Sequence, residues 1–208
     1  MTLTVPYWRD LAIETLRAPA QAAERVMAFQ LPRDVLWLSL LLVAVLNTIV
    51  YMVTNILVPT PSPLPGAFQS PVVFLFIVAG GLVLTVHALY WTGRALGGTG
   101  ELGDILVLMI WLQALRVALQ VITLVLLILA PVLAAFVVMA AALWGIWILV
   151  NFINTAHHLN SLPRAAGVLV AAMLGLALGP VSYTHLTLPT IILPCRSGWS
   201  PYHYKRGG

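Results

Sequence analysis

A run of polar side chains lies within one apolar segment of this chain and is the strongest candidate for binding chemistry. Arg116 sits near the middle of the segment 105–130. Gln113 precedes it by three residues, and Gln120 and Thr123 follow it by four and seven. These offsets place all four side chains on one face of an α-helix. A cation flanked by amides is suited to binding an anion or a lipid headgroup, so we expect this stripe to face the interior of the protein.

The surroundings of Arg116 are strongly apolar. Placing an arginine at the centre of a membrane span costs roughly 2.5–3.5 kcal/mol, and no Asp or Glu occurs within the apolar segments to offset that cost. We expect amides and carbonyls to partner it, with Asn47, Asn55 and Asn151 on neighbouring segments as candidates. Two interpretations stay open. The stripe lines a small cavity that binds an anionic group, or the amides hydrogen-bond the helices together, at about 0.6 kcal/mol each.

Other residues with chemical potential give weaker signals. His157 and His158 are adjacent, so on a helix they point about 100° apart and do not chelate one metal; we expect them to anchor a membrane interface. His87 is expected to be neutral and bonded to a backbone carbonyl. The loop Gly97–Asp104, GGTGELGD, departs from phosphate-binding patterns and is interpreted as a helix start that Asp104 caps. We predict no catalytic residue, no cofactor and no metal site.

Composition requires a membrane protein. Hydrophobic residues make up 61% of the chain and charged residues 8%, compared with roughly 45–50% and about 25% in soluble domains. A membrane-crossing helix needs about 20 apolar residues. The sequence predicts an all-α polytopic integral membrane protein with five transmembrane helices, the fifth truncated, at 35–58, 72–93, 105–130, 132–153 and 165–180.

Charge sets the expected orientation and excludes one class of partner. Of the loops between spans, those carrying Arg94 and Arg164 should face the cytoplasm, as should residues 1–34 with their four arginines. The N-terminus is therefore expected on the cytoplasmic side. The membrane is expected to be a bacterial inner membrane, since the chain uses Arg almost to the exclusion of Lys. Up to Pro180 the arginines nearly balance the acids, so we predict no nucleic-acid partner.

Residues 1–34 form a cytoplasmic segment with an amphipathic helix over 7–31. An apolar stripe that includes Leu11, Ala22 and Val26 recurs at spacings of three or four, opposite a charged face, and Pro19 should kink or split the helix. The helix either lies on the cytoplasmic leaflet or packs under the helical bundle, and we favour the leaflet.

The end of the chain differs from the rest. Residues 181–190, VSYTHLTLPT, resemble a translated sequencing adapter, and the single Cys195 and the single Lys205 both lie beyond Pro180. We expect residues 181–208 to be a non-native read-through tail, which assigns them no function.

The layout of residues 35–180, with the amphipathic start that contains Ala18-Pro19-Ala20 and the hairpin Leu129-Ala-Pro131, resembles the Ypt-interacting (Yip) domain family of five-span membrane proteins, in its bacterial branch. The stretch 97–120 looks like the glycine-led start of that family's third span. The resemblance implies a non-enzymatic, membrane-organising protein that contacts the lipid bilayer and binds a protein partner through its N-terminal helix, with oligomers possible. The alternative is a small transporter or lipid-handling protein with an anion site at Arg116.

Overall fold

The computed structural model describes residues 5–59 and 70–191, with side chains as far as Leu178, and this part of the chain is helical. Two short helices come first, α1 (Val5–Arg17) and α2 (Pro19–Met27). The long helices are α3 (Arg33–Leu57), α4 (Pro71–Ala95), α5 (Leu102–Leu129) and α6 (Pro131–Ala156), and α7 (Leu162–Ile191) ends the series. The predicted all-α membrane fold with an N-terminal helix is thereby confirmed.

Four of these helices are long and apolar enough to cross a membrane, namely α3 to α6. At 1.5 Å per residue, their 25 to 28 residues span about 38–42 Å, which exceeds the roughly 30 Å hydrocarbon core. In α7 the apolar part is shorter, Leu162–Leu178, and its crossing of the membrane stays a prediction. The helix continues through 181–191, while residues 192–208 of the predicted tail lie outside the described residues.

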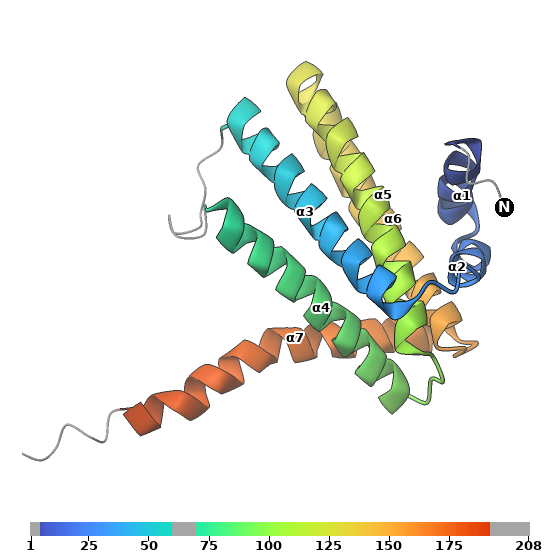
Figure 1. The fold of residues 1–208 in the computed structure, drawn as a ribbon, viewed down its shortest axis with the longest axis vertical. Helices are drawn as coiled ribbons and strands as arrows, with labels where there is room; N and C mark the ends of the chain where they lie inside the picture. The colour runs from blue at the N-terminus through green and yellow to red at the C-terminus, as the bar shows by residue number, and fades with distance from the viewer. Residues whose placement is uncertain (1–4, 60–69, 192–208) are drawn as a thin grey trace, which may run out of the picture.

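The long helices lie close together at one end of the bundle and spread apart toward the other (Figure 1). We call the end where α3 and α5 begin the near end, and the opposite one the far end. The buried side chains concentrate toward the near end, for example Leu36 and Leu40 on α3, Leu106 on α5 and Phe152 on α6. The far halves of α3, α5 and α6 expose large apolar side chains instead. This distribution leaves space between α3 and the α5–α6 hairpin at the far end.

Helix ends at the near end are closed by two turns of the same kind. After α4, Gly98 N–H donates to Gly93 C=O (2.9 Å) and Gly97 N–H to Arg94 C=O (3.1 Å), with Gly97 at φ +90°. After α6, Leu159 N–H donates to Asn154 C=O (3.1 Å). Both are Schellman turns, in which a residue with positive φ lets the last carbonyls find donors. In the second turn His158 takes this position, at φ +51°.

The start of α5 differs from its prediction. Its first helical residue is Leu102, its N-cap is Glu101, and no side chain caps it. Asp104 lies in the first turn of the helix, so the prediction that it occupies the capping position is wrong. The Glu101 backbone still bonds to its carboxylate, and its negative charge stabilises the positive end of the helix dipole.

His158 supplies a test of the second turn. Its side chain is exposed, so replacing it by glycine removes only the left-handed strain of a residue with a Cβ. We expect His158→Gly to raise stability by about 0.5–1 kcal/mol, after allowing for the larger entropy of glycine in the unfolded chain. Thermal unfolding in detergent, followed by circular dichroism, measures the change. His158→Ala keeps the Cβ and should give no such gain; an equal gain from both would contradict the assignment.

Candidate functional site

The polar stripe of α5 is divided between three environments. Gln113 is buried, Arg116 is exposed, and Gln120 and Thr123 line a cleft. Within the described part of the chain the Arg116 side chain forms no ion pair and no hydrogen bond, and the Oε1 atom of Gln120 is buried without a partner. Arg116 is therefore the member of the stripe that is open toward a ligand, a lipid or water, while Gln120 Oε1 lacks a partner inside the protein.

The three asparagines do not partner Arg116. Asn47 Nδ2 donates to Val43 C=O at 2.9 Å, and Asn151 Nδ2 donates to Trp147 C=O at 2.8 Å. Each of these bonds stays within one helix, four residues back. Asn55 is half-buried, and its side chain makes no hydrogen bond with the other described residues. The amides thus neither neutralise Arg116 nor bridge the helices by these bonds.

The cleft lies between α3, α5 and α6 at the far end and has a volume of about 370 Å³. Its polar lining residues are Tyr51 and Thr54 of α3 and Gln120 and Thr123 of α5, and the rest of the lining is apolar. Thr54 and Thr123 donate their hydroxyl hydrogens to backbone carbonyls of their own helices, at 2.7 and 3.0 Å. Their oxygens remain free to accept, while the Gln120 amide and the Tyr51 hydroxyl can both donate and accept, so the cleft presents acceptors together with some donors.

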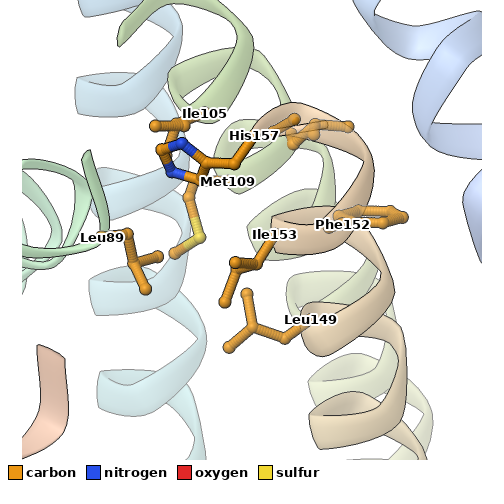
Figure 2. Close-up of a pocket in the computed structure, with 9 residues that line it drawn as sticks. Leu89, Ile105, Met109, Leu149, Phe152, Ile153 and His157 are labelled. Carbon is orange, nitrogen blue, oxygen red and sulfur yellow. The ribbon is translucent and has the colours of Figure 1, made fainter. Parts of the chain in front are cut away.

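A second feature, at the near end, involves His157, which follows directly after α6. Its side chain is 1% exposed, and neither ring nitrogen has a hydrogen-bond partner among the described residues. Figure 2 shows the ring beside Ile105 and Met109 of α5, with Leu89 of α4 on the same side. These residues line a cavity of about 10 Å³. That volume is about the minimum for one water molecule. The prediction that His157 anchors a membrane interface is therefore wrong, because the ring is inside the protein.

Glycines make room for this ring. A Cβ atom built on Gly93 would overlap the His157 ring, and one on Gly98 would lie 2.8 Å from the His157 Cβ. Gly100 is close to Ala156 C=O and His157 in the same way, and Thr99 N–H donates to His157 C=O at 3.1 Å. We call this group of Gly93, Gly98, Gly100 and His157 the histidine–glycine junction. It joins the α4–α5 turn to the end of α6.

The junction extends to α7 through Asn154. Its Oδ1 accepts a hydrogen bond from the backbone N–H of Ser161 at 2.9 Å, one residue before α7 begins. The near ends of α4, α5, α6 and α7 are thus connected within a few residues. The glycine spacing in 93–100 was a visible signal of close packing, but the partner ring lies about sixty residues away and is not predictable from spacing. The expected bond of His87 to a backbone carbonyl is present, with Nδ1 2.8 Å from Val83 C=O.

The N-terminal helices are fixed to the α5–α6 hairpin. The indole N–H of Trp111 donates to Thr15 Oγ1 at 2.9 Å, and that of Trp144 donates to Leu16 C=O at 3.1 Å. The apolar stripe, including Leu11 and Ala22, is buried, and α2 packs on α5 and α6. The preferred expectation, in which this stripe lies on the leaflet, is therefore wrong, because the protein itself covers the stripe.

Comparison with known protein families shows which family this chain belongs to. The Yip1 domain profile matches residues 13–182, which cover the end of α1, all of α2 to α6 and much of α7. The chain belongs to the Yip1 domain family. No curated protein and no solved structure matches it. The matched range of the Yip1 domain contains the α5 stripe, the cleft and the histidine–glycine junction.

The junction of this Yip1 domain makes its stability depend on pH. Burial lowers the pKa of His157 below its usual 6.5, the charges of Arg94 and His158 act in the same direction, and the Leu89 backbone opposes them. The unfolded chain therefore binds a proton that the folded protein rejects. The contribution of His157 to the free energy of unfolding is fully present above about pH 6.5 and decreases as the pH drops below that value.

We expect the thermal midpoint of the wild-type protein to fall between pH 7.5 and pH 5.5, and the fall to be smaller in His157→Gln, which has no group to protonate. Circular dichroism in detergent at matched ionic strength measures both. His158→Gln is the control, since it removes only the smallest contribution to the His157 pKa shift and should leave the slope closer to that of the wild type than to that of His157→Gln. Equal slopes in the wild type and His157→Gln would show that the buried ring does not govern the dependence.

Proposed function

We propose that this protein is a non-enzymatic membrane organiser that binds a partner protein through the outward face of α1 and α2. The observation that carries the proposal is the fixed position of these helices, which Trp111 and Trp144 hold against the α5–α6 hairpin. A docked pair of helices presents its outer side chains in one arrangement, so a partner that binds them loses less conformational freedom than it would with a loose tail.

The chemistry of the outward face favours a protein partner. Ile13 and Leu16 are 41% and 51% exposed, and charged residues of both signs surround them. An apolar centre with a polar rim is typical of protein interfaces. A lipid-binding patch would instead collect basic residues, whereas this face also carries acidic ones. The exposed charged residues are Arg9, Asp10, Arg17, Glu24 and Arg25.

The two helices are also held to each other. Arg25 Nη1 lies 2.7 Å from Glu14 Oε2 across the break at Ala18, and the Glu14 side chain is 17% exposed. This ion pair and the shared apolar packing keep the angle at Pro19 constant. The outward surfaces of α1 and α2 therefore act as one contact surface.

For location, we propose the bacterial inner membrane with the N-terminus, and thus the near end, in the cytoplasm. The support is the distribution of arginine, since Arg33, Arg94 and Arg164 all lie at the near-end boundaries of helices or in near-end loops. A partner that binds α1–α2 is then a cytoplasmic protein or the cytoplasmic part of another membrane protein.

Cysteine labelling tests the orientation. In a chain whose Cys195 is changed to Ser, we expect Ser70→Cys at the far end to react with a membrane-impermeant maleimide in intact bacterial spheroplasts. Asn160→Cys at the near end should react only after the membrane is opened, and both sites are exposed. The reverse pattern would contradict the orientation.

Photo-crosslinking tests the contact surface. With a photoreactive phenylalanine at Ile13, irradiation of native membranes should give one protein adduct of defined mass, and Arg17→Glu should reduce it strongly because it reverses a rim charge. The matched control carries the same group at Val72, which is 60% exposed on α4, and should give lipid adducts alone. Lipid adducts alone at both positions, or the same protein adducts at both, would overturn the proposal.

A further inference from the structure

We infer that the far-end cleft between α3, α5 and α6 binds the headgroup of a phospholipid that carries N–H or O–H donors. This site is separate from the contact surface on α1–α2, and neither proposal depends on the other. Its argument begins from the cleft volume of about 370 Å³, which falls in the roughly 300–1,000 Å³ range of small-molecule sites.

The cleft lies among membrane-spanning helices and is open to their surroundings. Val138, one of its lining residues, is 54% exposed, and Ala135 beside it is exposed as well. In a membrane the molecules next to such an opening are lipids. An acyl chain alone would satisfy a purely apolar groove, but this one contains polar groups that hydrocarbon leaves unpaired.

The polar groups of the cleft call for donors. Gln120 Oε1 has no partner among the described residues and is covered by its neighbours, so it accepts from a headgroup once the amide turns toward the cleft. The Thr54 and Thr123 hydroxyls donate to backbone carbonyls and so offer only their oxygens. Primary ammonium and hydroxyl headgroups supply N–H and O–H donors, whereas a trimethylammonium headgroup has none.

Arg116 provides the matching charge. It lies four residues, about 6 Å along the axis, on the near side of Gln120 and on the same face of α5. Its side chain is exposed and forms no ion pair within the described residues. A phospholipid phosphate would pair with the guanidinium, while the ammonium or hydroxyl of the same headgroup reaches Gln120.

The other wall of the cleft is held in place by an aromatic pair. The Tyr51 ring stacks on Phe74 of α4, with centroids 4.0 Å apart and planes at 8°. This contact connects α3 to α4 on the side away from α5. The separation of α3 from α5 that makes the cleft is therefore supported by packing on its outer side.

The experiment uses the full chain in phosphatidylcholine vesicles with a small amount of photoreactive phosphatidylethanolamine. We expect adducts on cleft residues of α3 and α6, in the peptides 50–54 and 134–138. Unlabelled phosphatidylethanolamine or phosphatidylglycerol should compete about two- to tenfold better than phosphatidylcholine, as one or two hydrogen bonds imply. Equal competition by all three lipids, or adducts spread evenly over the lipid-facing surface, would overturn the inference.

Three variants, each checked for folding by circular dichroism, sharpen the result. Gln120→Met keeps the side-chain length and should abolish the advantage of donor headgroups over phosphatidylcholine. Ala135→Trp fills the cleft and should remove the adducts, whereas Ile122→Trp, at an exposed site on α5 outside the cleft, should leave them. Unchanged adducts in Ala135→Trp would place the lipid elsewhere.

Discussion

The close approach of one imidazole ring to a glycine turn sets the arrangement of this bundle. His157 occupies space that exists because Gly93, Gly98 and Gly100 carry no side chains. The ring gains no hydrogen bond of good geometry there and only a weak contact with the Leu89 backbone, so its burial depends on packing and on remaining neutral. The backbone bond from Thr99 to His157 C=O completes the contact. Between helices in a membrane, where lipid is as apolar as a leucine side chain, small residues of this kind are what permit tight packing.

This fixed near end has consequences for both proposed sites. It holds α5 and α6 in the orientation against which α1 and α2 dock, and so positions the contact surface. Nothing of comparable tightness joins α3 to α5 at the far end, where exposed apolar side chains and the cleft are found. Because the helices are packed tightly at the near end and loosely at the far end, the protein can present a rigid contact surface to a partner and a more adaptable cleft to lipid.

The features that sequence could predict are those that follow from local chemistry. The length of the apolar runs predicted the membrane-spanning helices, and Pro19 predicted the break between α1 and α2, because proline removes a donor from the helix interior. The i, i+4 spacing of Arg116 and Gln120 predicted a shared face. The environments along that face were not predictable, since they depend on how α3 diverges from the α5–α6 hairpin.

Two errors had the same origin. The stripe of α1–α2 and the pair His157–His158 were both assigned to the membrane interface, yet Leu11 and His157 are buried by the protein itself. An apolar stripe is equally satisfied by lipid and by a neighbouring helix, so amphipathicity alone does not distinguish them. The bonds from Trp111 to Thr15, 96 residues apart, and from Trp144 to Leu16 decide the first case, and the glycines facing His157 decide the second.

The most direct test of the histidine–glycine junction is amide hydrogen exchange in lipid nanodiscs. Gly93→Ala should speed exchange in both 97–105 and 155–165, because the added methyl displaces the His157 ring and with it the bond between Thr99 and His157. Gly80→Ala, on the same helix with open space around it, should change neither segment. Unaltered exchange in Gly93→Ala, or faster exchange in only one of the two segments, would contradict the account.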